Sequence, residues 1–220
     1  GKPSATAGAR ASPPRISLPR PLCGATLREC APFNLCAAAA FASDHTDTEY
    51  CRRHGIEVAT AAGCNARGVL QYVAAALVRL SRVQAWEPAD KTLGIVGVGH
   101  VGSLVEAYAR TWGFRVVACD PPREEREHGG FLPLEEVACQ ADILTFHTPL
   151  DDTTRHMAGA KLFERMKPGS ILINTSRGEV VDGQALRESG LQYVLDVWEH
   201  EPDLDPLLLR DALLATPHIA

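Results

Sequence analysis

Three glycines in the segment Gly97-Val98-Gly99-His100-Val101-Gly102 follow the spacing G-x-G-x-x-G. In a loop between a strand and a helix, the first glycine permits a tight turn, the second lets the backbone approach a pyrophosphate, and the third lets the helix pack against the strand. The start of the helix then presents N–H groups and a partial positive charge to the phosphates. This spacing predicts a dinucleotide site with contacts from Gly97, Gly99, His100, Val101 and Gly102.

Asp120 provides the acidic residue that such a site requires. It ends the next predicted strand, about 20 residues after the first glycine, as is typical of dinucleotide-binding units. Its carboxylate can accept hydrogen bonds from the adenosine ribose, and its charge would repel the extra phosphate of NADP. We therefore predict NAD as the cofactor. The alternative is a tight strand–helix turn that binds no ligand.

Polar residues also stand at the ends of three later predicted strands. Thr148 lies just past strand 142–146, Thr175 and Ser176 follow strand 170–174, and Asp196 ends strand 191–196. Each of them alone would be interpreted as a loop residue with a local hydrogen bond. Because ligands of parallel sheets bind beyond the carboxyl ends of the strands, the shared position of these four residues favours contacts with the cofactor.

The elements that must hold these residues are predicted from hydrophobic periodicity. Strands are expected at 57–60, 92–96, 114–119, 142–146, 170–174 and 191–196, and helices at 66–83, 102–112, 134–140, 160–166 and 183–189. Asn65 and Asp182 are expected to cap the first and last of these helices, and Pro121-Pro122 to break the chain after strand 114–119. The alternation predicts an α/β fold, a Rossmann-type doubly wound parallel sheet with helices on both faces and right-handed crossovers.

Composition argues against several functions. The 220 residues are 45% hydrophobic, which suffices for a sizeable core, and the formal net charge of −5 argues against nucleic acid or an anionic membrane as partner. No apolar run reaches the ~20 residues needed to span a bilayer. The seven cysteines include no C-x-x-C pair and the histidines show no metal-ligand spacing, so we expect no metal, and reduced thiols in a cytoplasmic protein.

Residues 1–36 differ from the rest of the chain. They are rich in Pro, Ala and Arg, with no acidic residue before Glu29. This composition is similar to that of a transit peptide, but the segment has neither an initiator Met nor a sustained amphipathic period. We expect it to be irregular and poorly folded.

Several stretches, in their order along the chain, resemble the D-isomer-specific 2-hydroxyacid dehydrogenases. They are Gly63-Cys64-Asn65-Ala66, Gly94-Ile95-Val96-Gly97-Val98-Gly99, Cys119-Asp120-Pro121-Pro122, Ala141-Asp142-Ile143-Leu144-Thr145-Phe146-His147-Thr148-Pro149-Leu150, Ile171-Leu172-Ile173-Asn174, Arg177-Gly178 and Asp196-Val197-Trp198-Glu199. The resemblance extends from about residue 43 to residue 220. It implies an NAD-binding domain, here residues 65–220 with 66–83 as a linker helix, and a second α/β domain for the substrate, of which residues 37–64 would be a remnant.

The resemblance also implies a catalytic set of one Arg, one Glu and one His. By motif these fall on Arg177, Glu201 and His218. When hydride leaves C2 of a 2-hydroxy acid, the C2 hydroxyl must lose a proton, and a neutral imidazole at His218 is suited to accept it. Glu201 would orient that imidazole, and the planar donors of Arg177 would bind the substrate carboxylate and the developing carbonyl oxygen. Without the resemblance, each of the three would be interpreted as a solvated surface residue or a turn residue.

The implied substrate is a small phosphorylated 2-hydroxy acid, 4-phospho-D-erythronate, which is oxidised at C2 in the synthesis of pyridoxal phosphate. The alternatives are another acid of the family, such as phosphoglycerate or glyoxylate, and a non-catalytic NAD-binding module. The family's Gly- and Thr-rich loop meets the substrate phosphate, whereas this chain has Ala37-Ala38-Ala39-Ala40-Phe41-Ala42, whose methyl groups cannot donate hydrogen bonds.

The family's chain would continue beyond Ala220 with a returning helix and a C-terminal dimerisation region. We therefore expect the sequence to be a fragment or a degraded gene product, without the contacts of the homodimer that the family implies.

Overall fold

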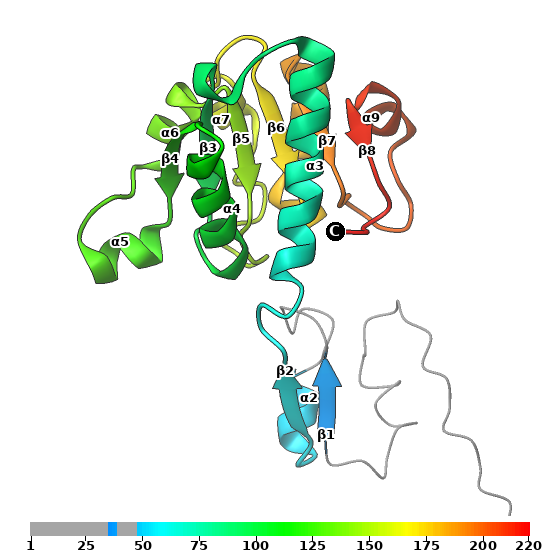
Figure 1. The fold of residues 1–220 in the computed structure, drawn as a ribbon. Helices are drawn as coiled ribbons and strands as arrows, with labels where there is room; N and C mark the ends of the chain where they lie inside the picture. Colours follow the sequence, from blue (N-terminus) through cyan, green and yellow to red (C-terminus); the bar gives the residue numbers. More distant parts are fainter. Residues whose placement is uncertain (1–34, 39–47) are drawn as a thin grey trace, which may run out of the picture.

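A parallel sheet of six strands forms the centre of the part of the chain that the computed structural model describes, residues 35–38 and 48–220 (Figure 1). In spatial order the strands are β4 (Arg115–Cys119), β3 (Thr92–Val96), β5 (Ile143–Phe146), β6 (Ile171–Asn174), β7 (Gln192–Leu195) and β8 (Leu214–Ala215). Every neighbouring pair is parallel. The strand order reverses between β3 and β5, which is where sheets of this kind bind ligands. The predicted Rossmann-type fold is confirmed.

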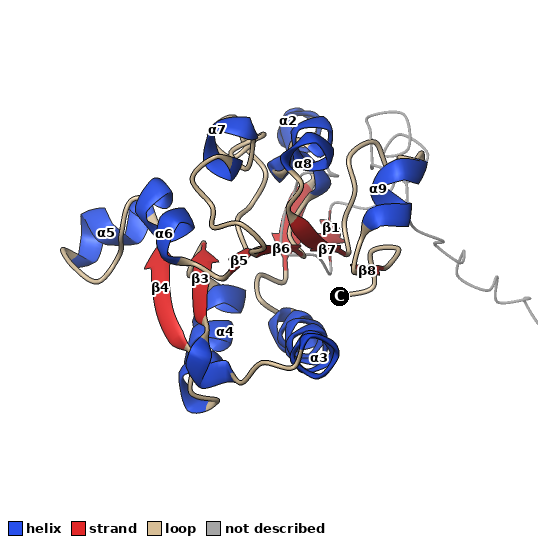
Figure 2. Cartoon of the chain, turned by 90° about the horizontal axis from the view of Figure 1, so that it is seen from above, coloured by secondary structure: helices blue, strands red, loops and turns tan. Residues whose placement is uncertain are grey.

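Helices cover both faces of this sheet (Figure 2). On one face lie α3 (Ala66–Gln84) and α4 (His100–Thr111), and on the other lie α6 (Leu134–Gln140), α7 (Ala160–Phe163), α8 (Gly183–Ser189) and α9 (Pro206–Asp211). Two hydrophobic cores result, one on each side of the strands. Such a two-sided core explains why the central strands β5 and β6 are buried at every position.

Alternation along the strands divides the side chains between the two cores. Ile171 and Ile173 of β6 pack in the core with α3 and α4, whereas Leu172 packs in the core with α6 to α9. Successive side chains of a strand point to opposite faces, so a run of apolar residues serves both layers at once. This arrangement fixes where each strand ends, and therefore where the residues that follow each strand are placed.

Helix α3 begins one residue after Asn65, as predicted, and ends at Gln84 with Ala85 in the left-handed conformation. The predicted side-chain cap at Asn65 is wrong, since no capping hydrogen bond forms; its Nδ2 donates to the backbone oxygen of Ala220, 3.0 Å away. The predicted cap at Asp182 is confirmed, since its carboxylate accepts a hydrogen bond from the backbone N–H of Ala185 at the start of α8.

The strand ends before Pro121-Pro122, as predicted, since β4 stops at Cys119, but the helix that follows was not predicted. These prolines open a helix, α5 (Pro121–Glu127), whose first turn is capped by the Asp120 carboxylate. Proline is favoured in the first turn of a helix because the N–H it lacks would have no partner there. Helix α7 is shorter than the predicted 160–166, α4 starts two residues before the predicted 102, and α9 and β8 were not predicted.

A smaller unit precedes α3. Strand β1 (Leu35–Ala38) pairs in parallel with β2 (Glu57–Thr60), and the helix α2 (Thr48–Arg53) lies between them in the chain. The expectation of an irregular segment over 1–36 falls on residues 1–34 outside the described part, while positions 35 and 36 belong to β1. The assignment of 37–64 to a remnant domain, separate from 65–220, stays a prediction. Among the described helices, none combines the length and apolar character needed to cross a bilayer.

Candidate cofactor and catalytic site

The glycine loop connects β3 to α4, and two of its glycines allow its tight backbone conformation. Gly97 has a φ of 85°, a conformation that favours glycine, and its N–H donates to the backbone oxygen of Cys119 over 2.9 Å. A Cβ atom at Gly102 would overlap the backbone oxygen of Gly97. Both glycines are therefore required by the fold of the loop itself, before any ligand is considered.

Gly99 is different, because none of the described residues lies near the position of its missing side chain. A Cβ atom there would meet no heavy atom of the described residues within 4 Å. No side chain caps the helix of 12 residues that starts at His100, next to Val101. An open space over a glycine at the start of a long helix fits the pyrophosphate of a dinucleotide.

Asp120 ties the loop to the adjacent strand. One carboxylate oxygen accepts from the backbone N–H of Val98 at 2.7 Å, and the other accepts from the backbone N–H of Arg123 at 3.0 Å. The guanidinium of Arg123 donates to the backbone oxygen of Val98 and pairs with Glu127. A carboxylate is thus held beside the glycine loop, where a ribose would lie.

His147 and Thr148 leave β5 directly beside the loop. The N–H of His147 donates to the backbone oxygen of Val96 at 2.8 Å, and a Cβ on Gly97 would lie 2.7 Å from the backbone oxygen of His147. The imidazole lies between the hydroxyls of Thr145 and Thr175, at 3.1 and 3.5 Å. Burial lowers the pKa of His147 to about 4, so the ring is neutral at physiological pH.

Asn174 organises the loop that carries Ser176 and Arg177. Its side-chain oxygen accepts from the N–H and the hydroxyl of Ser176, at 3.0 and 2.8 Å, and its Nδ2 donates to the backbone oxygen of Arg177 at 2.8 Å. The Arg177 guanidinium donates to the backbone oxygen of Ser176 at 2.7 Å. The hydroxyl of Ser176 is therefore engaged within the loop, and its predicted contact with the cofactor stays a prediction.

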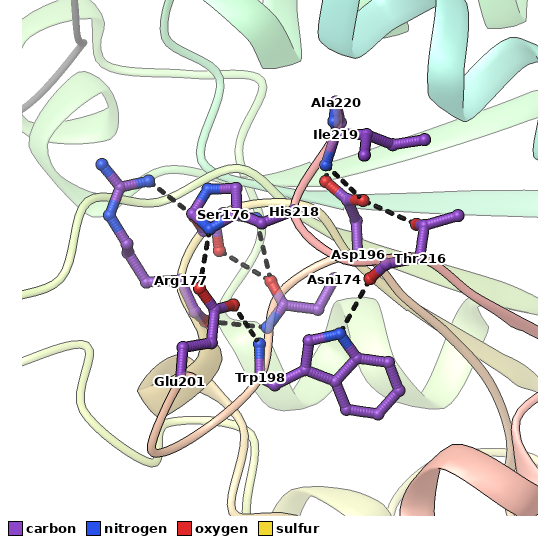
Figure 3. A network of polar contacts seen from close by, with 10 residues as sticks. All are labelled: Asn174, Ser176, Arg177, Asp196, Trp198, Glu201, Thr216, His218, Ile219 and Ala220. Carbon is purple, nitrogen blue, oxygen red and sulfur yellow. Dashed lines mark hydrogen bonds and ion pairs between the residues drawn. The ribbon is translucent and has the colours of Figure 1, made fainter. Parts of the chain in front are cut away.

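Glu201 and His218 are in direct contact (Figure 3). The Nδ1 atom of His218 lies 2.9 Å from Oε2 of Glu201, and Oε1 of the same carboxylate accepts from the backbone N–H of Trp198 at 2.9 Å. Since an ionised carboxylate can only accept, Nδ1 carries the proton in the neutral imidazole and Nε2 carries the lone pair. This arrangement is that of an oriented general base.

Gly178 lets the loop that carries Arg177 touch the loop that carries Glu201. A Cβ atom at this position would overlap the backbone carbon and oxygen of Trp198. The residue after Arg177 therefore packs directly on the backbone that holds Glu201. Figure 3 shows Arg177, Glu201 and His218 in one cluster, as the family resemblance implies.

Asp196 is fully buried behind this cluster. Its carboxylate accepts hydrogen bonds from the Thr216 hydroxyl at 2.6 Å and from the backbone N–H groups of Ile219 and Ala220 at 2.9 and 2.8 Å. The predicted contact of Asp196 with the cofactor stays a prediction. The roles of Asn174 and Thr216 were missed from the sequence, although their positions, at a strand end and two residues before the catalytic-type His218, were visible in it.

All these residues lie at the carboxyl edge of the parallel sheet. The glycine loop follows β3, Asp120 follows β4, Thr148 follows β5, Arg177 follows β6 and Asp196 follows β7. The predicted cofactor and catalytic residues therefore share one edge of the sheet.

The chain is similar to known proteins over most of its length. Residues 66–220 match the family described as D-isomer specific 2-hydroxyacid dehydrogenase, NAD binding domain. An erythronate-4-phosphate dehydrogenase of Azotobacter vinelandii is 46% identical over 187 residues, which are 81% of this chain and 49% of the relative. One from Bacteroides fragilis is 43% identical over 211 residues, 91% of this chain and 61% of the relative. The chain thus spans about half the length of the curated relatives it matches.

Solved structures show the same fold. The D-lactate dehydrogenase from Aquifex aeolicus, complexed with NAD and lactic acid, superposes with a TM-score of 0.75 at 26% identity, over 90% of this chain and 73% of that one. The 3-phosphoglycerate dehydrogenase of Entamoeba histolytica, with NAD+ bound, gives a TM-score of 0.72 at 26% identity, over 83% of this chain and 63% of that one.

Proposed function

The chain belongs to the D-isomer specific 2-hydroxyacid dehydrogenase family through its NAD binding domain, and we propose that it serves the NAD-dependent oxidation of 4-phospho-D-erythronate at C2. The observation that carries the proposal is the contact between His218 and Glu201 at the sheet edge that also holds the glycine loop. The names of the relatives from Azotobacter vinelandii and Bacteroides fragilis support the choice of substrate.

The cofactor residues of this proposal are those of the glycine loop together with Asp120. The open space at Gly99 accepts the pyrophosphate, and Asp120 accepts hydrogen bonds from the ribose. When bound, NAD supplies the acceptor for the hydride that leaves C2.

His218 acts as the base for the C2 hydroxyl. Its Nδ1 proton is directed to Glu201, so Nε2 is the atom that accepts the hydroxyl proton. Once the imidazole is protonated, the Glu201 carboxylate stabilises its charge. The bond from the Trp198 N–H to Glu201 keeps the carboxylate in place during this transfer.

Arg177 binds the substrate carboxylate in this proposal. Its guanidinium offers donors in a fixed plane, which suits a carboxylate and the oxygen that becomes the carbonyl of the product. Its backbone is fixed by Asn174, so the position of the charge is set by the loop after β6.

The biological setting belongs to the same proposal. We assign the protein to the cytoplasm and to pyridoxal phosphate synthesis, with the family's homodimer as its assembly. Cys119 and Cys139 are free thiols, which is usual for a reducing compartment.

An NADH assay with 4-phospho-D-erythronate tests the proposal, with 3-phosphoglycerate, glycolate and D-lactate measured in parallel. We expect NADH formation with the first acid and its loss in His218→Gln. Turnover with phosphoglycerate or glycolate alone would assign a different substrate of the family. If NAD binds and no acid is oxidised, the chain is a non-catalytic NAD-binding module and the proposed oxidation is wrong.

A further inference from the structure

A chain of side-chain hydrogen bonds runs from α3 to the buried Asp196. The hydroxyl of Tyr72, on α3, lies 2.6 Å from Oγ1 of Thr216, and Thr216 Oγ1 lies 2.6 Å from Oδ1 of Asp196. Tyr72 is 144 positions away from Thr216 in the sequence, so this connection exists only in the folded protein. The proposed binding of cofactor and substrate does not depend on this chain of hydrogen bonds.

The direction of these hydrogen bonds follows from the number of protons available. An ionised Asp196 can only accept, so the single hydroxyl proton of Thr216 points to Asp196. Thr216 must then accept from Tyr72, whose phenol is the donor. Burial raises the pKa of Tyr72, the hydrogen bond to Thr216 opposes this, and the charge of Asp196 raises it further. The phenol therefore keeps its proton at neutral pH and remains a donor.

Asp196 in turn holds the backbone on both sides of the His218 side chain. Its backbone oxygen accepts from the N–H of His218 at 2.7 Å, and its carboxylate accepts from the N–H groups of Ile219 and Ala220. His218 itself has a φ of 55°, in the left-handed region that is unfavourable for a residue with a side chain. A conformation of this kind persists only when its surroundings impose it.

We propose that Tyr72, Thr216 and Asp196 form a positioning relay through which α3 sets the orientation of the His218 imidazole toward Glu201. The three are positioning residues, since they act on His218 through its backbone and not on a substrate. A second tie supports the same connection, because Asn65 at the start of α3 donates to the backbone oxygen of Ala220. A movement of α3 is thereby transmitted to the residue assigned as the base.

Single-hydroxyl variants test the relay in the intact chain. Tyr72→Phe removes only the phenolic oxygen, and Thr216→Val removes the connection to Asp196, while Thr216→Ser restores the hydroxyl. Tyr108→Phe, on the exposed side of α4, is the matched control. The readouts are amide hydrogen exchange at residues 218–220 and the NMR signal of the His218 Nδ1 proton, with urea unfolding recorded for each variant.

We expect exchange at residues 218–220 to accelerate about tenfold in Thr216→Val and about threefold in Tyr72→Phe, while amides in β6 keep their rates. The Nδ1 proton signal should broaden or shift in both variants, and Thr216→Ser should restore both readouts. Unchanged exchange and an unchanged proton signal in Thr216→Val would overturn the relay, as would an equal acceleration at every amide, which reports general destabilisation.

The relay rests on the proposed function only because that function assigns His218 as the base. Different experiments would reject the relay and the proposed function. Absence of NADH formation with intact exchange protection at residues 218–220 would reject the dehydrogenase activity and leave the relay standing. Normal turnover in variants with altered exchange and an altered Nδ1 signal would show that the relay exists but that its positioning is not needed for the base.

Discussion

The Nδ1 atom of His218 lies 2.9 Å from Oε2 of Glu201, although the two residues stand on different loops of the sheet edge. Glu201 follows β7 and is fixed by the backbone of Trp198, whereas His218 follows β8 and is fixed by Asp196. The pair is therefore held by two residues that follow β7, Trp198 and Asp196, and its side chains remain partly exposed.

Replacing His218 should separate chemistry from cofactor binding. In His218→Gln we expect kcat with 4-phospho-D-erythronate to fall about 10²- to 10⁴-fold, which is the usual contribution of a general base, because glutamine cannot accept the hydroxyl proton. The dissociation constant of NAD should change by less than about twofold, since no residue of the glycine loop is altered. Stopped-flow NADH formation and calorimetric NAD titration measure the two quantities. A kcat equal to that of the parent chain would show that His218 is not the base. The control is Asp203→Asn, an exposed substitution near the same loop.

Replacing two glycines of the same loop by alanine should affect different properties, stability at Gly102 and NAD affinity at Gly99. Gly102→Ala places a methyl group against the backbone oxygen of Gly97, so we expect the free energy of unfolding to fall by about 1–3 kcal/mol. Gly99→Ala meets no atom of the described residues, so we expect the free energy of unfolding to fall by less than in Gly102→Ala. The same methyl group occupies the space assigned to the pyrophosphate, and NAD affinity should fall at least about tenfold. Urea unfolding measures the free energy of unfolding of each variant, and NAD titration measures its affinity for NAD. A stable Gly99→Ala protein with undiminished NAD affinity would place the phosphates elsewhere.

Asp120 should govern both cofactor choice and the start of α5. Asp120→Ala removes the ribose acceptor, and we expect NAD binding to weaken about tenfold or more. The loss of the cap on α5 should lower the free energy of unfolding by about 1 kcal/mol. Without the negative charge, the preference for NAD over NADP should shrink, which parallel titrations with the two cofactors would show. Asp120→Asn keeps one oxygen acceptor without the charge and separates the two effects. An unchanged NAD-to-NADP ratio in both variants would contradict the assignment.

His147 should make the folded protein sensitive to acid. Burial holds its pKa at about 4, whereas an imidazole in the unfolded chain takes up a proton near pH 6.5. Between these values the unfolded state binds more protons, so the free energy of unfolding falls as the pH falls. From pH 6.5 to pH 5 this residue alone should account for about 2 kcal/mol. His147→Gln cannot titrate, so urea unfolding at the two pH values should show a correspondingly smaller loss than in the parent chain. Parallel pH dependences in the two proteins would mean that the ring is accessible to protons.

Local sequence signals identified the sheet and the glycine loop because each depends on residues close in the chain. The strand at 92–96 and the helix at 134–140 have the bounds that periodicity predicts. Helix α5 was missed because Pro121-Pro122 was interpreted as a break, although an aspartate before a proline is a common start of a helix.

The connections between distant residues could not be predicted in the same way. The contact between Tyr72 and Thr216, and the bond from Asn65 to Ala220, depend on how α3 crosses the sheet, which no local pattern states. The pair of Glu201 and His218 was anticipated only through the family resemblance. Asp196 lies at the predicted carboxyl edge of the sheet, but the sequence did not predict that its side chain accepts hydrogen bonds from the backbone of residues 219 and 220.

Gly178 has a consequence for how such chains can diverge. The backbone of Trp198 occupies the space that a side chain at Gly178 would need. Gly178 therefore joins the loop of Arg177, the proposed anchor of the substrate carboxylate, to the loop of Glu201, which would orient the proposed base. Any side chain there would move them apart while leaving Arg177, Glu201 and His218 unchanged in the sequence. A homologue that keeps all three and has lost this glycine would be expected to retain the signature of the enzyme without its reaction, which makes an apparently unremarkable residue the better indicator of activity.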